Sequence, residues 1–290
     1  MPHENPPRLF CFGLGYSARA LADALQGEGW RIAGTNRETA AAGADDRAIF
    51  AFDGASAMPD AAAALAGTTH LLSSVPPGAD GDPVLAWHAD DIAAISGLRW
   101  IGYLSTTGVY GDRQGGWVDE DSPREPTGSR GARRVAAEDG WFALGARCGV
   151  PVQSFRLAGI YGPGRNALET VRGGNARRVV KPGQVFSRIH VDDIVAVLRA
   201  SIERPNAGAA YNVCDNEAAP PETVIEYACE LLGVEPPPPV AFEDAELSPM
   251  GRSFYRDNKR VSNRRIREEL GVTLKWPSYR EGLQALLADC

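Results

Sequence analysis

The chain has 290 residues, of which 44% are hydrophobic, and its formal net charge at pH 7 is −7, from 30 Lys and Arg against 37 Asp and Glu. This length and apolar content suffice for a large core, in one big domain or one domain with a smaller addition. The acidic balance argues against nucleic acid as the main partner, because a phosphate-binding surface needs a basic field.

The first half of the chain alternates strand and helix patterns. Strands are predicted at Arg8–Phe12, Trp30–Thr35, Ala48–Asp53, His70–Val75, Trp100–Ser105 and Val152–Leu157. Helices are predicted at Ser17–Glu28, Ala61–Leu65, Val84–Ile95 and 131–147. This βαβα alternation predicts an α/β fold of Rossmann type, a doubly wound parallel sheet with helices on both faces. The ligand crevice is then expected at the carboxyl ends of the strands.

Beyond residue 160 the pattern becomes mixed. Strands are predicted at Val185–His190 and Ala210–Val213, and helices at Asp192–Ile202, Glu222–Leu232, Asn263–Leu270 and Tyr279–Leu287. Asp192 is expected to cap the helix that runs through 194–202, and Pro236–Pro239 to form a stiff connector. Residues 1–160 are expected to form the Rossmann domain, to which the strand at 185–190 and the helix at 192–202 return, and 161–290 to form mostly a smaller α/β lobe.

Cysteine usage and the absence of long apolar runs predict a cytoplasmic protein. The five cysteines are odd in number, and no two have the spacing of a metal knuckle or redox motif. We expect reduced core thiols and no metal, with Cys11 and Cys214 inside apolar strand patterns. Residues 1–8 are polar and proline-rich, unlike a signal peptide. No apolar run approaches the ~20 residues of a membrane span, so no membrane partner is expected.

The first predicted strand ends in Gly13-x-Gly15-x-x-Ala18, and a helical pattern follows at once. A strand that turns sharply into a helix leaves backbone N–H groups free at the helix start, and these suit a pyrophosphate. Gly13 allows the tight turn, Gly15 lets the backbone approach the phosphates, and Ala18 keeps the helix close to the strand. The pattern predicts a dinucleotide site that includes Tyr16 and Ser17; the alternative is an ordinary strand–helix turn.

The second strand indicates which dinucleotide would bind. It runs into Asn36 and Arg37 without a carboxylate, where an NAD site usually has an acidic residue for the ribose 2′-OH. Arg37 is placed to pair with a 2′-phosphate, so NADP is favoured over NAD, unless Arg37 is simply a solvated strand end. Asn36 and Val75 complete the cofactor candidates. Asp53 either accepts from the adenine amino group or forms a turn before the next glycine.

Three later segments carry a family resemblance. They read Ser-Thr-Thr-Gly-Val-Tyr-Gly at 105–111, Arg-Leu-Ala-Gly-Ile-Tyr-Gly-Pro-Gly at 156–164 and Arg-Ile-His-Val-Asp-Asp-Ile at 188–194. In this order and spacing they resemble the extended short-chain dehydrogenase/reductase family, which includes nucleotide-sugar epimerases and dehydratases. The resemblance runs from residue 8 to about residue 287. It implies a Rossmann-type NAD(P) domain and a smaller carboxy-terminal substrate lobe.

The chain departs from that family at its acid/base pair. The family's Tyr-x-x-x-Lys lies at the start of the helix after the fifth-strand loop, where this chain has Arg130 and Arg134. The glycine loop also reads GxGxxA instead of GxxGxxG, so the chain resembles an atypical branch. Arginine cannot act as the base, because its pKa lies above ~12. Arg130 is expected to bind a phosphate or carboxylate or to polarise a carbonyl, and Arg134 to orient the nicotinamide ribose.

Other site residues follow from the same resemblance. Thr106 matches the family's Ser/Thr that hydrogen-bonds the reacting oxygen, although a strand-end threonine also serves local backbone groups. Thr107, Arg156 and Tyr161 are substrate-binding candidates. For Arg156 the alternative is an ion pair inside the fold, and for Tyr161 it is packing.

Two further features offered acids and bases for the reaction. Asp119 and Glu120 are candidate acids, with a solvated loop as the alternative. The sequence also contains a Tyr-x-x-x-Lys match at Tyr255 and Lys259. We attribute it to chance, because it lies near the carboxy terminus, far from the helix start where the family has this pair.

Together these features predict an NAD(P)-dependent oxidoreductase or epimerase-like protein. Its substrate is expected to be a small polar molecule, with a nucleotide sugar as one candidate. The proton would be moved by a group that the sequence does not identify. The alternative is a non-catalytic NADP(H)-binding sensor or regulatory module, which the missing Tyr/Lys pair favours. By analogy with the family, the protein is expected to be a monomer or homodimer.

Overall fold

The structure is a computed structural model that describes residues 6–38 and 47–288. The chain divides into two compact units, each assembled from three stretches. Unit 1 takes the chain up to Thr106, then Ala132–Arg156 and Val197–Tyr211. Unit 2 takes Thr107–Gly131, Leu157–Ala196 and the chain from Asn212 onward.

A seven-stranded parallel sheet organises unit 1, in the order β11-β7-β5-β4-β1-β2-β3. Only the last residue of β7 and the last two of β11 belong to unit 2. The strands are β1 (Arg8–Phe12), β2 (Arg31–Asn36), β3 (Ala48–Ala51), β4 (His70–Ser73), β5 (Trp100–Thr106), β7 (Val152–Leu157) and β11 (Ala210–Val213). The helices of this part of the chain are α1 (Tyr16–Gln26), α2 (Ala61–Leu65), α3 (Pro83–Ala93), α4 (Ser129–Cys148) and α6 (Val191–Glu203).

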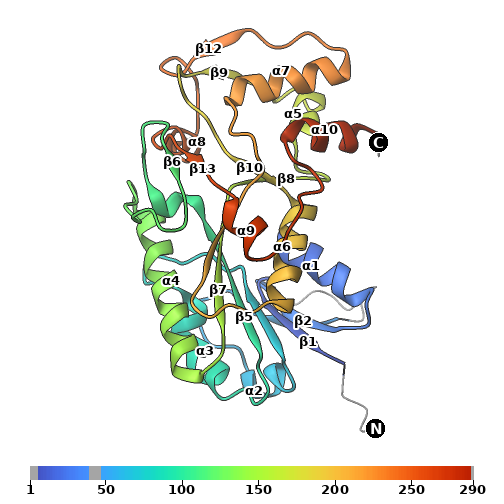
Figure 1. Cartoon of the computed structure of the whole chain (residues 1–290), viewed down its shortest axis with the longest axis vertical. Helices are drawn as coiled ribbons and strands as arrows, with labels where there is room; N and C mark the ends of the chain where they lie inside the picture. The colour runs from blue at the N-terminus through green and yellow to red at the C-terminus, as the bar shows by residue number, and fades with distance from the viewer. Residues whose placement is uncertain (1–5, 39–46, 289–290) are drawn as a thin grey trace. The chain divides into compact units, whose positions relative to one another are not determined.

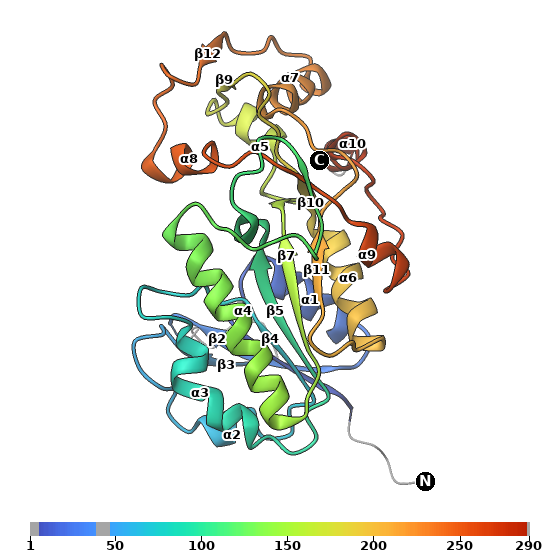
Figure 2. The ribbon, with the colours of Figure 1, turned by 60° about the vertical axis from the view of Figure 1, so that its left-hand side comes forward.

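Helices cover both faces of the sheet, with α3 and α4 on one face and α1 and α6 on the other (Figures 1 and 2). Alternation along β1 explains how one strand serves both faces, because successive side chains point to opposite sides. Phe10 and Phe12 pack into the core under α2, α3 and α4, with Tyr103 and Trp141. The fold class predicted from the βαβα alternation is therefore confirmed.

Element bounds in unit 1 lie within two residues of the sequence prediction. β3 ends at Ala51 instead of Asp53, β4 at Ser73 instead of Val75, α1 at Gln26 instead of Glu28 and α3 at Ala93 instead of Ile95. The first residue beyond each of the two strands still donates to a neighbouring strand, Phe52 N–H to the Asn36 carbonyl (2.8 Å) and Ser74 N–H to the Phe12 carbonyl (2.9 Å). Cys11, Cys214 and Cys229 are buried free thiols, and Cys290 lies outside the described residues.

Unit 2 is built from short elements around its own core. Its helical segments are η1 (Thr107–Tyr110), α5 (Ala167–Arg172), α7 (Pro221–Leu232), α8 (Pro249–Phe254), α9 (Arg264–Glu268) and α10 (Tyr279–Ala288). Its short strands form parallel pairs: β8 (Gly159–Tyr161) with β10 (Arg188–His190), β9 (Arg178–Val180) with β12 (Pro239–Ala241), and β6 (Trp117–Val118) with β13 (Arg260–Val261). The core joins α5, α7 and α10 through Leu168, Val224 and Leu283.

Three expectations for this half of the chain are corrected. The strand expected at Val185–His190 covers only Arg188–His190, because Phe186 makes an isolated antiparallel bridge with Ala219. Pro239 begins β12 instead of ending a free connector. Asp192 does not cap a helix: its carboxylate accepts from Lys275 Nζ (2.9 Å) and Trp276 Nε1 (3.2 Å). Across residues 6–38 and 47–288, no helix combines the length and apolar character that crossing a bilayer requires.

Candidate functional site

The turn after β1 fixes Gly13 in a conformation that other residues avoid. Its φ is +82°, and a Cβ built there would lie 2.8 Å from Ser74 Oγ. That hydroxyl donates to the Gly13 carbonyl at 2.6 Å, and the Gly13 N–H donates to Thr35 Oγ1 at 2.8 Å. Left-handed φ and close packing both require glycine at this position. The fold itself therefore explains Gly13.

Gly15 differs from Gly13, because no contact among residues 6–38 and 47–288 requires it to be glycine. Its φ and ψ are −82° and −170°, which any residue adopts, and a Cβ there would have its nearest neighbour, Ser74 Oγ, 4.0 Å away. The space beside the Gly15 backbone is open and exposed. A ligand that approaches the backbone at a helix start needs such open space, and a glycine provides it.

The start of α1 is left free for an anion. Gly15 occupies the N-cap position without a side-chain cap, and no acidic residue lies in the first turn. Ser17 and Ala18 are buried, so their side chains pack inward, while Tyr16 is half-buried. The positive end of the helix therefore has no carboxylate in its own first turn to neutralise it. These residues fit the pyrophosphate of a dinucleotide.

A third glycine, Gly34 in β2, shapes the same turn, and the sequence reasoning missed it. A Cβ at Gly34 would lie 2.6 Å from the Cys11 carbonyl oxygen and 2.7 Å from Leu14 Cδ1. The Leu14 N–H donates to the Thr35 carbonyl at 2.8 Å, which ties the loop to β2. A glycine in the interior of a predicted strand was the available signal, since such glycines often mark close backbone approach.

The ends of β2 and β4 bring the remaining cofactor candidates to this edge of the sheet. Asn36 is the last residue of β2, at the position where an acidic residue usually meets the ribose of NAD. Arg37 is exposed, and it has no hydrogen-bond or ion-pair partner among the residues that the structure describes. Glu38, next along the chain, is also exposed. Val75 forms a wall of the glycine turn, with its Cγ2 3.2 Å from a Cβ built at Gly13.

Asp53 adopts the turn-forming role that was one of its two predicted roles. It is exposed, and its Oδ1 accepts from the Ala55 N–H at 2.8 Å. Gly54 between them has a φ of +87°, as such a turn requires. Trp87 Nε1 donates to the Gly54 carbonyl at 3.1 Å. The local Asp-Gly sequence was sufficient to predict this turn.

The Arg134 side chain is hydrogen-bonded to β5. It is half-buried, and its Nη1 donates to the Leu104 carbonyl (2.7 Å) and to Tyr103 Oη (3.0 Å). Both partners lie on β5, which ends at Thr106. Burial raises the pKa of Tyr103 above its ordinary value, so this tyrosine is no better a base than an exposed one. Arg134 therefore braces the strand that carries Thr106.

Arg130 lies in unit 2, on the first turn of α4, and its side chain is exposed. Its guanidinium lies 5.6 Å from the centre of the Phe254 ring. It has no hydrogen-bond or ion-pair partner within the described part of the chain. The neighbouring Gly131 packs on the 105–111 motif, since a Cβ there would lie 2.7 Å from the Gly108 carbonyl oxygen. Arg130 and this motif are thus close together.

Arg156 makes the internal ion pair that was one of its two interpretations. Its Nη2 lies 2.9 Å from Glu138 Oε2 and its Nε 3.1 Å from Oε1, with Glu138 fully buried. Ser154 Oγ donates to the same carboxylate at 3.0 Å. Burial by itself opposes ionisation, but the Arg156 hydrogen bonds and charge bring the pKa of Glu138 below its ordinary value. The pair is a structural element of unit 1.

Tyr161 packs inside unit 2, and Thr107 begins η1. The Tyr161 hydroxyl donates to the Ser278 carbonyl at 3.3 Å, and its ring meets the His190 ring edge-on at 5.1 Å. Burial raises the pKa of Tyr161, which makes it a poor base at neutral pH. Thr107 is half-buried.

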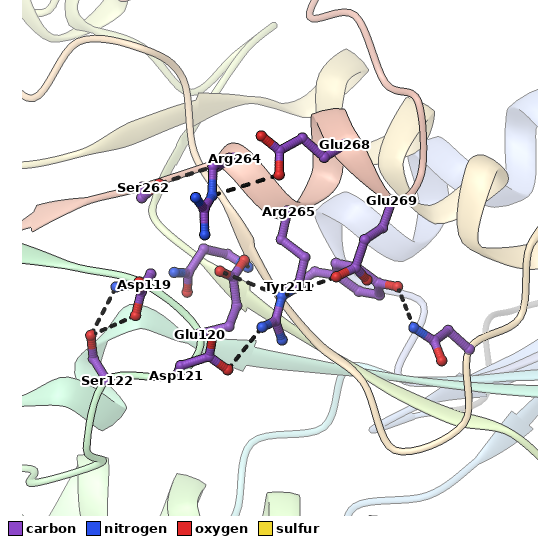
Figure 3. A network of polar contacts seen from close by, with 12 residues as sticks. Asp119, Glu120, Asp121, Ser122, Tyr211, Ser262, Arg264, Arg265, Glu268 and Glu269 are labelled. Atoms are coloured by element: carbon purple, nitrogen blue, oxygen red, sulfur yellow. Dashed lines mark hydrogen bonds and ion pairs between the residues drawn. The ribbon is translucent and has the colours of Figure 1, made fainter.

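The acidic loop after the motif is neutralised within unit 2, as Figure 3 shows. Arg265 Nη2 lies 2.8 Å from Asp121 Oδ1, and its Nε lies 3.3 Å from Glu269 and 4.0 Å from Glu120. Asp119 accepts from Ser122 Oγ at 2.8 Å, and Glu120 accepts from the Asn212 N–H at 2.7 Å. Asp119 and Glu120 therefore hold a loop in place.

Lys259 has a structural role that the sequence reasoning did not foresee. It is 9% exposed, and its Nζ donates to the Gly111 carbonyl (2.7 Å) and to Asp257 Oδ2 (3.2 Å). Burial lowers the pKa of Lys259. The Asn258 carbonyl accepts from the N–H groups of residues 113 and 115. Segment 257–259 thus fastens the end of the 105–111 motif, while the Tyr255 ring stacks on Phe242.

One buried acid in unit 2 has a raised pKa. Asp215 is 3% exposed, and its Oδ1 accepts from the Glu217 N–H at 3.1 Å. Burial raises the pKa of Asp215 to about 8.

In the described ranges, no three His, Cys, Asp or Glu side chains gather as a metal ion would require.

Comparisons with known proteins agree with this architecture. The model of the NAD dependent epimerase/dehydratase family matches residues 13–214. Protein YeeZ of Escherichia coli (strain K12) is 27% identical over 277 residues, which cover 91% of this chain and 94% of that protein. A functionally unknown conserved protein from Silicibacter pomeroyi DSS is 52% identical, with a TM-score of 0.88 over 98% of this chain and 99% of that one. MoeE5 in complex with UDP-glucose and NAD is 19% identical and shares the fold, with a TM-score of 0.77 over 97% of both chains.

Proposed function

The chain belongs to the NAD-dependent epimerase/dehydratase family, and from that premise we propose that it is an NAD(P)-dependent oxidoreductase or epimerase-like protein acting on a small polar substrate. The observation that carries this proposal is the contrast between the two loop glycines. Gly13 is required by the fold, whereas no residue of the described part of the chain fills the space beside Gly15 or caps the start of α1 with its side chain. A dinucleotide pyrophosphate bound there would account for both.

For the coenzyme we propose NADP, with NAD as the alternative. Asn36 replaces the usual acidic residue at the end of β2, and the exposed Arg37 would hold a ribose 2′-phosphate. MoeE5, which shares the fold, is described with NAD bound. The preference for NADP therefore rests on Asn36 and Arg37, while the negative charge of Glu38 beside them opposes a phosphate.

The residues around β5 suggest how the chain would assist the reaction. When bound, a nicotinamide coenzyme supplies hydride transfer. The Thr106 hydroxyl would donate to or accept from the reacting oxygen, and Arg134 would keep β5 in place through the Leu104 carbonyl. Arg130 would contact the substrate. Since arginine stays protonated and Tyr103 is buried, we propose that the proton is exchanged through Thr106 and solvent.

We take nucleotide sugars as the first substrates to test, because MoeE5 is described with UDP-glucose. The experiment is NADPH oxidation by the purified full-length chain, with a panel of sugar nucleotides and simple carbonyl compounds. Thr106→Val is expected to abolish turnover and leave NADPH affinity nearly unchanged. Thr170→Val is the matched control, because Thr170 is also half-buried and its hydroxyl serves only the local Asn166 carbonyl. Equal activity of the Thr106→Val variant and the wild type would contradict the proposal.

A non-catalytic NADP(H) sensor is the second candidate, and the arginines at the two catalytic places of the family favour it. Arg134 is engaged with β5, and arginine at 130 cannot replace a tyrosine base. This candidate predicts tight NADPH binding without turnover on any member of the panel.

We further propose a cytoplasmic location and a monomeric or homodimeric state. Size-exclusion chromatography with light scattering measures that state directly.

A further inference from the structure

An exposed arginine stacked on an exposed phenyl ring stands beside the 105–111 motif. Phe254, at the end of α8, is 54% exposed, and the Arg130 guanidinium lies 5.6 Å from its ring centre. Phenylalanine is most often buried, but the Phe254 ring is not, and Arg130 has no hydrogen-bond or ion-pair partner within the described residues.

The positive charge of Arg130 adds to that of the helix end on which it lies. α4 is 20 residues long and begins at Ser129, so Arg130 lies in its first turn, and that turn contains no acidic residue. A helix N-terminus carries a partial positive charge, and a cation there is unfavourable for helix stability. Arg130 and the helix end therefore act together on any anion that approaches, at a cost to the isolated helix.

The two side chains are held on fixed backbone. Gly131 packs against the Gly108 carbonyl, and the Thr127 hydroxyl donates to Asp257, three residues after Phe254. The start of α4 and the end of α8 are thus joined directly. Ring recognition would benefit from this arrangement, since a rigid site loses little entropy when a ligand binds.

The residue after Phe254 belongs to a second group of aromatic rings and cations. The Tyr255 ring stacks on Phe242 at 5.0 Å, and Arg252 and Lys181 lie 5.1 and 5.3 Å from the Phe242 ring centre. Rings bordered by cations suit a ligand that combines a π-face with negative charge. A guanidinium stacked on a ring keeps its N–H edge available for a planar oxyanion.

We propose that Arg130 and Phe254 recognise a substrate in which a carboxylate or phosphate group is attached to a planar ring. The proposal rests on the proposed function and names a class for the small polar substrate that Arg130 would contact. Arg130 would pair with the oxyanion, and Phe254 would stack on the ring. The residue that replaces the family's tyrosine would then select the substrate by charge.

The test measures binding of four small probes to the full-length chain by isothermal titration or ligand-observed NMR, with and without saturating NADPH. Benzoate and phenyl phosphate carry a ring and an anion, benzamide carries the ring without charge, and cyclohexanecarboxylate carries the charge without a planar ring. We expect the wild type to bind benzoate or phenyl phosphate roughly tenfold or more tightly than either single-feature probe. Whichever of the two anions binds more tightly identifies the substrate's charged group.

Variants assign the effect to the two side chains. Arg130→Gln is expected to bring benzoate and benzamide to equal affinity, and Phe254→Leu to remove the preference for benzoate over cyclohexanecarboxylate. Arg264→Gln is the control, because Arg264 is another exposed arginine of unit 2, paired with Glu268 and with its side chain 63% exposed. Both variants alter exposed positions, so the thermal midpoint should not move.

An anion preference that survives Arg130→Gln would overturn the proposal, and so would equal binding of all four probes by the wild type. Failure of the proposed function looks different. In that case NADPH does not bind, while the probes still distinguish Arg130→Gln from the wild type.

Discussion

Replacing each of the two loop glycines by alanine separates a structural requirement from a ligand requirement. Gly13→Ala places a Cβ 2.8 Å from Ser74 Oγ at a φ of +82°. A left-handed φ costs a non-glycine residue about 1–2 kcal/mol, and displacing Ser74 from its hydrogen bond costs roughly 0.5–1.5 kcal/mol more. We expect the free energy of unfolding to fall by about 2–3 kcal/mol.

Gly15→Ala should leave stability almost unchanged. Alanine is a poorer N-cap than glycine, by a few tenths of a kcal/mol to about 1 kcal/mol. Alanine also restricts the unfolded chain more than glycine does, which stabilises the folded state by about 0.4–1 kcal/mol. The added methyl has no protein neighbour nearer than 4.0 Å, so it would occupy the space proposed for the pyrophosphate. Loss of one or two charge-assisted N–H bonds predicts a roughly 10- to 100-fold weaker affinity for NADPH.

Urea unfolding and calorimetric titration with NADPH measure the two quantities on the same preparations. The reasoning predicts a stable Gly15→Ala variant that binds poorly and a destabilised Gly13→Ala variant. A Gly15→Ala variant that binds NADPH like the wild type would refute it, because the open space would then have no part in binding. Equal stability losses in both variants would refute the structural half.

Three further outcomes are expected from substitutions elsewhere in the chain. Arg37→Gln should weaken NADPH binding by roughly tenfold or more without changing NADH binding, as calorimetry can measure, whereas Arg19→Gln on the exposed side of α1 should change neither. Glu138→Gln should cost about 3–5 kcal/mol in urea unfolding at pH 7, because it strands the buried Arg156 charge; this contribution is present above the ordinary pKa of 4.5 and is lost as pH falls through the lower folded value. Asp215 has a folded pKa of about 8 against an ordinary 3.8, so the unfolded chain loses a proton that the folded chain keeps, and stability should fall as pH rises between those values; Asp215→Asn should flatten that decline in unfolding experiments across the same pH range.

Much of unit 1 could be predicted from the sequence, because strand and helix patterns alternate along it. β1, α2 and β7 have the predicted bounds. The glycine turn was predictable for the same reason: Gly13 must adopt positive φ wherever a strand meets a helix so abruptly.

Unit 2 was harder to predict because its elements are short and depend on distant partners. β6 and β13 are two residues each, and the chain that leads into β13 is fastened to Gly111 by Lys259, 148 residues away in the sequence. No local periodicity can indicate a two-residue strand. Arg134 shows the same limit at the site, since its sequence position says nothing of the Leu104 carbonyl that holds it.

The route of the chain limits how this protein can be divided. The backbone passes from one unit to the other after Thr106, Gly131, Arg156, Ala196 and Tyr211, and several of these passages run through the middle of a helix or strand. No single cut yields two self-sufficient fragments, so truncation at a supposed domain border should give insoluble material from either end. Recombination with a relative would likewise have to exchange both units together.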